Sequence, residues 1–335
     1  MNRKLSHFFD SMWYGKRPIA LLFIPLSWLF FLIINVRKFL YNNGWKASAR
    51  VAAPVIIVGN ITVGGTGKTP LVIWLAQLLE KAGYRPGIIS RGYGGIASSW
   101  PQQAREDSDS RVVGDEAKIL ARRAGCPVAV GPNRANSAQA LIERHGCDVI
   151  VSDDGLQHYA IQRDIEIAIV DGERRYGNGY LLPAGPLREP VERLKEVDIV
   201  VCNGLASGDE FPLRVEGKVA INVLDQTITK PLEDFNEQHV HAVAGLGNPS
   251  RFFSHLKKFG VLFEPHIYPD HYEYTQNDIT FSDDKLVMMT EKDAVKCTEI
   301  ANDNCWYVPI RAQMTEKFGL TVLSLLQKST WIKNY

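Results

Sequence analysis

The stretch PVIIVGN (54–60), continued by TVGGTGKTP (62–70) and LVIWLAQLLEKAG (71–83), decides the fold of this chain. The first segment is a β-branched apolar run, which is typical of a buried strand. The second is rich in glycine and contains Gly-Lys-Thr. In the third, leucines recur at helical spacing and Gly83 is a natural helix stop. A strand, a glycine-rich turn and a helix in this order predict a phosphate-binding loop.

The glycine-rich turn offers the groups that hold a nucleoside triphosphate. Its glycines permit positive φ angles, so successive backbone N–H groups can point inward around phosphate oxygens. Lys68 is expected to reach the β- and γ-phosphates, and Thr69 to offer its hydroxyl to Mg²⁺. Thr62 replaces the first glycine of the usual G-x-x-x-x-G-K-[ST] pattern, so the loop is a variant with paired glycines. The predicted nucleotide-binding residues are Gly64, Gly65, Thr66, Gly67, Lys68 and Thr69.

A second apolar run ends in two carboxylates. In CDVIVSDDGLQH (147–158) the segment 149–151 leads into Asp153 and Asp154. A phosphate-binding loop needs an acidic metal site at the end of a neighbouring strand. Adjacent strand residues face opposite ways, so one carboxylate would hold Mg²⁺, directly or through water, while the other orients a partner. The sequence leaves open which of the two touches the metal.

Composition bounds the class of protein. The chain has 335 residues, of which 45% are hydrophobic and 22% charged, which excludes a disordered, collagen-like or disulfide-scaffold protein. The net charge of +1 gives no overall field toward nucleic acid, so no nucleic-acid partner is expected. Five scattered cysteines without a C-x-x-C pair indicate reduced thiols rather than a disulfide framework or zinc ribbon.

The N-terminal segment is apolar in basic surroundings. PIALLFIPLSWLFFLIINV (18–36) has no charged residue and, as a helix, would extend about 28 Å, just short of the ~30 Å hydrocarbon layer. Residues 1–50 hold eight basic side chains against one acid, a charge of +7, which leaves −6 for the remainder. Three of the seven tryptophans lie in the first 45 residues, as an aromatic belt would place them.

Three interpretations of this segment are open: a single-span anchor, a helix within one leaflet, and a buried core helix. Lys16 and Arg17 precede the run and Arg37 and Lys38 follow it, so the positive-inside rule sets no orientation. Pro25 would kink a spanning helix. Both facts favour a monotopic or peripheral helix whose ends stay on the cytoplasmic side, near anionic lipid.

Further short apolar runs alternate with helical stretches along the rest of the chain. This alternation predicts the α/β class, here a P-loop NTPase-type, mostly parallel sheet with helices on both faces. Ligands then bind beyond the carboxyl ends of the strands. The pattern weakens around 224–238. We therefore expect a membrane-associating segment at 1–45, a P-loop domain at 46–227 and a smaller C-terminal α/β domain at 228–335.

Two segments that precede Asp153 and Asp154 in the chain contain candidate catalytic or binding residues. Asp115 and Glu116 stand at a predicted helix start after a loop, where acids also act simply as caps. Arg134, in VGPNR, is a candidate phosphate contact, and a surface arginine is its alternative.

A third segment, GYLLPAGPLREP (179–190), has two glycines and three prolines without a period. It is too long for a simple turn and too apolar for a disordered linker, which favours a structured functional loop. Arg188 and Glu189 within it could clamp an anion.

Four histidines raise the question of a further metal site. His239 and His241 share one face of a predicted strand, and His266 precedes His271 by five residues, but no cysteine or glutamate spacing completes a tetrahedral set. We therefore expect no zinc site among them. His271, next to Asp270 in PDHYEY, is better interpreted as a proton-handling or polar-network residue.

With these segments in place, the motifs GNITVGGTGKTP, SRGYGG, GDEAKIL, VGPNR, DDGLQH, NGYLLPAGPLREP, GLGNPSRFF, PDHYEY and MTEKDAVKC follow one another along the chain. By this series the chain closely resembles the tetraacyldisaccharide 4′-kinases, the lipid A 4′-kinases of Gram-negative bacteria, over nearly its whole length. The resemblance implies transfer of the γ-phosphate of ATP to the 4′-hydroxyl of a tetraacylated glucosamine disaccharide 1-phosphate at the cytoplasmic face of the inner membrane. It also implies a P-loop α/β domain, a smaller α/β domain and an N-terminal membrane-associating helix.

The resemblance also assigns ligands and roles. ATP and Mg²⁺ are the implied ligands, with Asp153 and Asp154 as the metal-site acids and Asp115 and His271 as the catalytic dyad. The expected partners are the lipid disaccharide and anionic inner-membrane lipid, and the protein is expected to act as a monomer. The supporting active-site positions are Glu116, Arg134, His158, Arg188 and Glu189.

Two rival classes stay open on the residues alone. A membrane-associated P-loop ATPase of the partitioning or targeting type would share the paired glycines and the apolar helix, but such proteins usually carry a lysine where this chain has Val63. A soluble small-molecule ligase or kinase would share the sheet but has no use for residues 18–36. The destination of the γ-phosphate separates the three classes.

Overall fold

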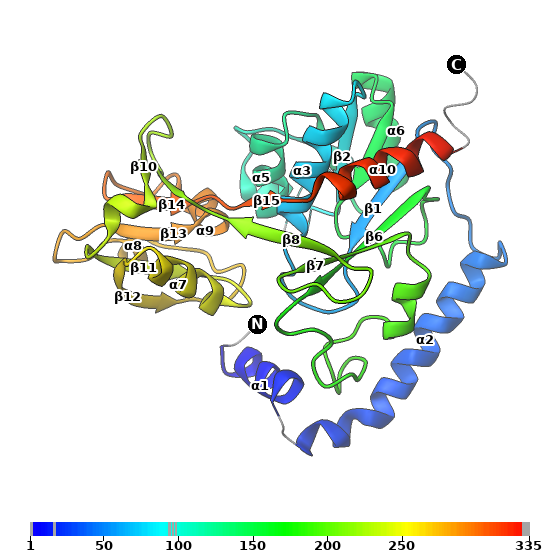
Figure 1. Cartoon of the computed structure of the whole chain (residues 1–335), viewed down its shortest axis with the longest axis horizontal. Coiled ribbons are helices and arrows are strands. Elements are labelled where there is room, and N and C mark those ends of the chain that lie inside the picture. Colours follow the sequence, from blue (N-terminus) through cyan, green and yellow to red (C-terminus); the bar gives the residue numbers. More distant parts are fainter. Residues whose placement is uncertain (1–2, 16–17, 93–94, 96, 98, 330–335) are drawn as a thin grey trace. The chain divides into compact units, whose positions relative to one another are not determined.

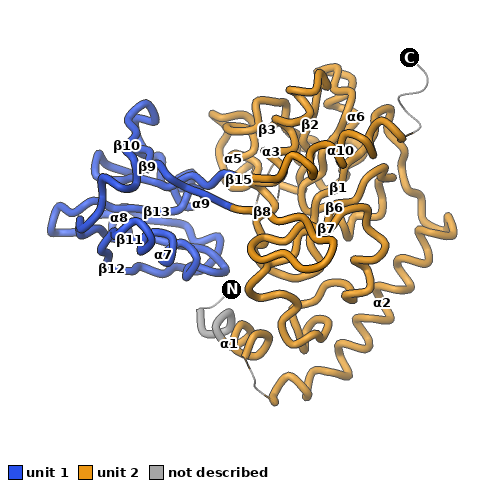
Figure 2. Tube along the Cα trace, in the orientation of Figure 1, with its two compact units in different colours: residues 1–6, 215–311 blue, residues 7–214, 312–335 orange. Residues whose placement is uncertain are grey.

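The computed structural model describes residues 3–15, 18–92, 95, 97 and 99–329. They form two compact units (Figure 2). The larger unit contains residues 7–214 and the chain from residue 312 onward, and the smaller one contains residues 215–311. The predicted basic pair Lys16 and Arg17, and two residues of the SRGYGG motif, lie outside the described residues.

A sheet forms the centre of the larger unit, and Figure 1 labels β1, β2, β6, β7, β8 and β15 in it. The sheet has nine strands in the order β15-β8-β7-β6-β1-β5-β2-β4-β3. The pairs from β8 to β4 are parallel, and β3 pairs antiparallel with β4. Because β1 lies between β5 and β6, the chain segments that follow β1 and β5 emerge next to each other at the ligand-binding edge. The strands are β1 (Val55–Gly59), β2 (Pro86–Ser90), β3 (Gln102–Ala104), β4 (Val128–Val130), β5 (Val149–Ser152), β6 (Ile165–Asp171), β7 (Ile199–Asn203), β8 (Phe211–Glu216) and β15 (Arg311–Gln313).

Helices cover both faces of this sheet, as alternation along β1 shows. Ile57 packs in a buried cluster with Ala138 and Leu141 of helix α6, whereas its fully buried neighbours Ile56 and Val58 face the side where helix α3 packs. Each such buried side chain stabilises the fold by about 1.5–3 kcal/mol. The predicted α/β class is thereby confirmed. The helices are α3 (Lys68–Lys81), α4 (Ser110–Val113), α5 (Asp115–Arg123), α6 (Arg134–His145), the short η2 (Val191–Lys195) and α10 (Glu316–Lys328).

Three further helical segments begin the chain: α1 (Arg3–Tyr14), η1 (Pro18–Phe23) and α2 (Ile24–Asn42). Pro18–Asn42 is, among the described residues, the one helical stretch long and apolar enough to cross a membrane by length and composition, and only 11% of its most apolar window is buried. The first turn of α2 is hydrogen-bonded to the rest of the larger unit. Ser27, 4% exposed, donates its hydroxyl to the carbonyl of Leu181 at 2.8 Å and accepts from the amide of Ala184 at 3.1 Å.

The smaller unit has its own six-stranded sheet in the order β10-β9-β14-β13-β11-β12, with parallel pairs from β12 to β14 and antiparallel pairs from β14 to β10. Its buried residues form one apolar cluster on each face. The elements are β9 (Val219–Asn222), β10 (Thr229–Pro231), η3 (Leu232–Phe235), β11 (His239–Ala244), α7 (Pro249–Lys258), β12 (Leu262–Ile267), α8 (Gln276–Ile279), β13 (Val287–Thr290), α9 (Glu291–Cys297) and β14 (Cys305–Val308).

The two units differ from the predicted division at 45/46 and 227/228. The smaller unit begins at residue 215, twelve residues after β7 ends, because β9 pairs with β14 and β10 pairs with β9, so that neither joins the larger sheet. The chain from residue 312 returns to the larger unit, where Phe318 of α10 stacks near Trp74 of α3. Trp74 and Phe318 are far apart in the sequence, and the local sequence pattern does not predict a contact between such distant residues.

Candidate active site

The glycine-rich turn after β1 has the backbone that its sequence predicts. Gly64 and Gly67 have φ angles of 103° and 97°, in the left-handed region that favours glycine. A Cβ at Gly67 would lie 2.7 Å from the side-chain nitrogen of Asn203, so this turn also needs glycine for space. Asn203, at the end of β7, donates to the carbonyl of Thr66 at 2.9 Å. The turn is therefore held open by a neighbouring strand before helix α3 begins at Lys68.

Lys68 points into a polar cluster at the sheet edge. Its ammonium donates to the side-chain oxygen of Asn60 at 3.2 Å and lies 3.5 Å from the carboxylate of Asp154. Only 12% of the Lys68 side chain is exposed. Asn60 is the residue after β1 and is fully buried, and its amide in turn donates to the carbonyl of Gly64. Asn60 therefore holds both Lys68 and the loop in place through hydrogen bonds. Its position in the sequence alone did not indicate this role.

Asp153 and Asp154 follow β5 and have opposite electrostatic environments. Burial raises the pKa of Asp153 to about 7, and the nearby charge of Glu116 adds to the rise although Lys68 opposes it. Burial would also raise the pKa of Asp154, but Lys68 and Arg188 outweigh it and lower the value to about 2. Asp154 is therefore ionised at neutral pH, while Asp153 needs a nearby cation to be fully ionised.

Arg134 and Arg188 approach Asp154 from two different elements. Arg134, at the start of α6 and 2% exposed, donates to the hydroxyl of Ser152 at 2.5 Å and to the backbone carbonyl of Asp154 at 2.8 Å. Burial lowers its pKa to about 10, which leaves the guanidinium charged. Arg188 donates to both carboxylate oxygens of Asp154 at 3.1 Å. The predicted residues Lys68, Arg134, Asp154 and Arg188 therefore meet in one cluster.

The predicted functional loop 179–190 packs against the phosphate-binding turn. The amide of Val63 donates to the carbonyl of Pro186 at 2.9 Å, and the amide of Arg188 donates to the carbonyl of Ile61 at 2.7 Å. The same loop is hydrogen-bonded to Ser27 of α2 through the backbone of Leu181 and Ala184. Loop 179–190 therefore touches both the apolar helix and the phosphate-binding turn.

Glu189 and His158, two of the predicted supporting residues, have surroundings that differ from those of Arg134 and Arg188. Glu189, 4% exposed, lies 3.1 Å from the guanidinium of Arg193 and accepts from the hydroxyl of Tyr159 at 3.2 Å. Arg193 continues to Glu166 of β6, so Glu189 belongs to a buried ion network beneath the loop. His158 is half-buried, and burial together with Arg134 lowers its pKa to about 4. His158 is therefore neutral at physiological pH.

The two residues of the predicted dyad lie in different units. Asp115 is the first residue of α5 in the larger unit, follows Gly114 with a φ of 91°, and is 8% exposed. His271 belongs to the smaller unit and has a φ of 59°. Its neighbour Asp270 accepts from Lys292 of α9 at 3.0 Å, and the charges of Lys292 and His271 lower the Asp270 pKa against the effect of burial.

The fit of a divalent cation can be judged from the polar atoms at the sheet edge. Asp153 is 1% exposed, and its Oδ1 has no hydrogen-bond partner within the described part of the chain. A buried carboxylate oxygen of this kind is costly unless a cation approaches it. Thr69, in the first turn of α3, offers a hydroxyl of the type that Mg²⁺ accepts. The residues present therefore fit the predicted magnesium site.

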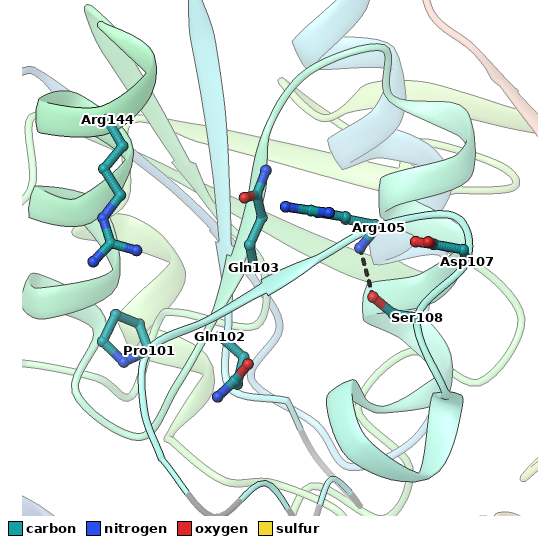
Figure 3. A pocket seen from close by; sticks show the side chains of 7 residues that line it. All are labelled: Pro101, Gln102, Gln103, Arg105, Asp107, Ser108 and Arg144. Carbon is teal, nitrogen blue, oxygen red and sulfur yellow. Dashed lines mark hydrogen bonds between the residues drawn. The ribbon is translucent and has the colours of Figure 1, made fainter.

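A separate pocket of about 470 Å³ lies on the surface around β3 (Figure 3). Its lining includes Arg105, Asp107 and Arg144, with Gln102 and Gln103 of β3, and none of the predicted site residues. It is an open, polar depression. The candidate active site is instead the polar cluster at the ends of β1 and β5, where side chains of several elements converge.

Three comparisons with known proteins agree with the motif series. A family model described as Tetraacyldisaccharide-1-P 4′-kinase (LpxK) matches residues 19–327. The Tetraacyldisaccharide 4′-kinase of Nitrosococcus oceani is 52% identical over 317 residues, which cover 95% of this chain and 94% of the relative. That of Methylobacillus flagellatus is 47% identical over 332 residues, which cover 98% of both chains.

A solved structure is similar over the whole fold. The crystal structure of LpxK from Aquifex aeolicus in complex with ATP superposes with a TM-score of 0.78 at 27% sequence identity. The match covers 92% of this chain and 99% of the other. The resemblance predicted from the motifs is therefore confirmed in both sequence and fold.

Proposed function

Because the chain belongs to the tetraacyldisaccharide-1-P 4′-kinase family, we propose that it transfers the γ-phosphate of ATP to the 4′-hydroxyl of the tetraacylated glucosamine disaccharide 1-phosphate precursor of lipid A. The observation that carries the proposal is the cluster of Lys68, Asp154 and Arg188 beside the glycine-rich turn. Two cations share one carboxylate there. A triphosphate offers both of them a more highly charged partner.

The chain's own residues would bind and orient the triphosphate. Backbone N–H groups of residues 64–69 and the N-terminal end of α3 would hold the β- and γ-phosphates, and Lys68 would exchange Asp154 for the phosphates. Thr69 with Asp153 or Asp154 would hold Mg²⁺, which when bound neutralises charge that develops on the transferred group. Asn60 and Asn203 keep the turn in its binding conformation.

The acceptor hydroxyl must lose its proton during the transfer. We assign this task to Asp115, oriented or tuned by His271, in keeping with the predicted dyad. Since the two residues belong to different units, closure of the units on bound substrates would assemble the dyad and limit wasteful ATP hydrolysis. Glu116, Arg134, His158, Arg188 and Glu189 support this site, Glu189 through its ion pair with Arg193.

The apolar N-terminal helix could associate with a membrane, and we propose that it lies within the cytoplasmic leaflet of the inner membrane. A substrate with four acyl chains leaves a bilayer only at about 0.8 kcal/mol per exposed CH₂, so the enzyme must reach it there. Ser27, near the middle of the apolar stretch, is hydrogen-bonded to loop 179–190. Ser27 lies in the first turn of α2 and at the midpoint of the apolar stretch 18–36, and an apolar stretch attached at its midpoint to the folded unit suits an in-plane position better than a span. Arg37, which is exposed, would contact anionic lipid, whereas Lys38 pairs with Glu196, and the protein would act as a monomer.

Labelled phosphate provides the test of the function. Incubation with γ-labelled ATP and the disaccharide 1-phosphate acceptor is expected to place the label in lipid. An acceptor whose 4′-hydroxyl is already phosphorylated is the matched control and should remain unlabelled. Label in inorganic phosphate alone would favour the ATPase interpretation, and label in a soluble product the small-molecule kinase. Either outcome would refute the proposed function.

The in-plane position of α2 predicts a surface-specific effect on lipid binding. Leu29 and Leu32 are 54% and 58% exposed on the apolar side of α2. Replacing both by aspartate is expected to reduce binding to vesicles of anionic phospholipid by more than about tenfold, because each buried leucine contributes about 1.5–3 kcal/mol. Cosedimentation measures the binding.

Leu205 provides the matched control for this substitution. It is 90% exposed and follows β7, outside the N-terminal helices. Leu205→Asp should leave vesicle binding unchanged. Equal losses in the double variant and in the control would contradict a membrane role for the exposed face of α2.

A further inference from the structure

A cluster of two histidines and two carboxylates lies on one face of the sheet in the smaller unit, which contains none of the predicted nucleotide-binding residues. The parallel register of β11 and β12 places His241 opposite Glu264 and Val243 opposite His266. Side chains two residues apart share a face, so His241, Glu264 and His266 project to the same side. Register therefore brings in Glu264, whose sequence spacing gave no sign of a ligand set.

The ligand atoms of these three residues converge. The Nδ1 atom of His241 lies 2.9 Å from the Nε2 atom of His266 and 3.8 Å from a carboxylate oxygen of Glu264. All three ligand atoms lie within 4.8 Å of one another. Atoms that bind a tetrahedral zinc ion at about 2.0–2.1 Å are separated by about 3.3 Å, so the cluster has the dimensions of a metal site.

A fourth residue fixes the orientation of His241. Its Nε2 lies 2.9 Å from a carboxylate oxygen of Asp283, and an ionised carboxylate only accepts hydrogen bonds, so the proton is on Nε2. In the neutral ring this leaves the lone pair on Nδ1, the atom directed at His266 and Glu264. A carboxylate that holds the second nitrogen of a metal-binding histidine is a recurrent partner of such sites.

Packing holds the His241 ring without blocking its ligand atom. His241 is 4% exposed, and Phe281 stacks on its face with ring centroids 3.7 Å apart and planes 18° apart. Phe281 also lies 4.5 Å, centroid to centroid, from His266. Stacking covers the ring faces, whereas a metal binds in the ring plane. The Glu264 side chain is 68% exposed, which leaves solvent access for a water as a fourth ligand.

We propose that His241 Nδ1, His266 Nε2 and the Glu264 carboxylate form a binding site for a zinc-class divalent cation, with Asp283 as its positioning residue. Two imidazoles and one carboxylate suit zinc and its neighbours among the transition metals better than magnesium or calcium. The ion would link β12, an edge strand of the sheet, to β11. Because β12 ends at Ile267, the link would anchor the strand that leads into the His271 loop.

The test uses the full chain after removal of metal with EDTA and dialysis into buffer with excess Mg²⁺, which occupies oxygen-rich sites. Titration with Co²⁺ is expected to give the visible absorption of a tetrahedral complex, saturating at one ion per chain. Titration with Zn²⁺ should displace the Co²⁺ spectrum and raise the melting temperature. His266→Asn and Glu264→Gln are expected to weaken Co²⁺ binding by more than about tenfold, and Asp283→Asn by about 10–100-fold.

His239→Asn is the matched control. His239 is an exposed histidine of the same strand, two residues before His241, and its loss should leave Co²⁺ binding unchanged. Glu264→Gln changes an exposed side chain, so a loss of metal binding there cannot be assigned to misfolding. Absence of Co²⁺ binding to the wild-type chain would overturn the proposal. Binding that all three cluster variants retain would also overturn it, because the ion would then be held elsewhere, for instance by cysteine thiols.

Discussion

Replacing Lys68 by alanine is expected to reduce phosphate transfer to the lipid acceptor by about a thousandfold or more. Lys68 directly follows the glycine-rich turn, its side chain is 12% exposed, and its ammonium lies between Asn60 and Asp154. Removal of a single preorganised group that stabilises charge in a transition state typically costs 10²–10³ in rate, and cationic groups on a transferred phosphoryl cost more, about 10³–10⁵. The rate of label transfer at saturating ATP measures the effect.

Lys81→Ala provides the control for this variant, since Lys81 is an exposed residue in the last turn of the same helix. It should transfer phosphate at the wild-type rate. Thermal unfolding should show both variants folded, because alanine favours the helix and Lys68 is at its first position. A Lys68→Ala enzyme within tenfold of the wild type would contradict the assignment of the phosphate-binding loop.

Asp115→Asn is expected to lower kcat by about 10²–10⁴ while the KM for ATP stays nearly constant. Proton transfer by a positioned side chain contributes about this factor, and asparagine keeps the shape but cannot accept the proton. Asparagine also remains a favourable residue at a helix start, so the first turn of α5 is preserved. Separate measurement of kcat and KM distinguishes loss of the base from loss of nucleotide binding.

The dyad can be tested as a unit with His271→Asn. His271 has a φ of 59°, a conformation that asparagine adopts more readily than most residues, so this variant keeps the backbone better than alanine would. If Asp115 and His271 act together, the double variant should be no slower than Asp115→Asn alone. Asp209→Asn, at an exposed aspartate of the larger unit, is the control. Additive losses, or near-normal turnover in either single variant, would refute the dyad.

Local patterns predicted the parts of the fold that depend on neighbouring residues. The strand 54–60, the glycine turn and the following helix appear as β1, residues 60–67 and α3, because strand propensity, positive-φ glycines and leucine spacing are all encoded within 30 residues. The acidic pair after β5 could be predicted for the same reason. Its position beside Lys68 follows from parallel sheets, whose strand ends meet at one edge.

Contacts between distant segments could not be predicted in this way. Glu264 meets His241 only through the register of two strands whose pairing leaves no mark in either segment. Asn60 and Asn203 were missed because an asparagine after a strand is common in loops, and their contacts with the glycine turn are visible only in three dimensions. The placement of Glu189 against Arg193 likewise depends on a buried ion network, which charge spacing does not reveal.

Loop 179–190 has a geometric consequence for catalysis at a bilayer. It contacts α2 through Leu181 and Ala184 and the phosphate-binding turn through Pro186, only a few residues later. Because this connection is so short, the loop fixes the distance between the triphosphate-binding turn and α2. If α2 lies within one leaflet, as we propose, the enzyme would act at a fixed height above the acyl chains, and sugars held at other depths would fall outside its reach.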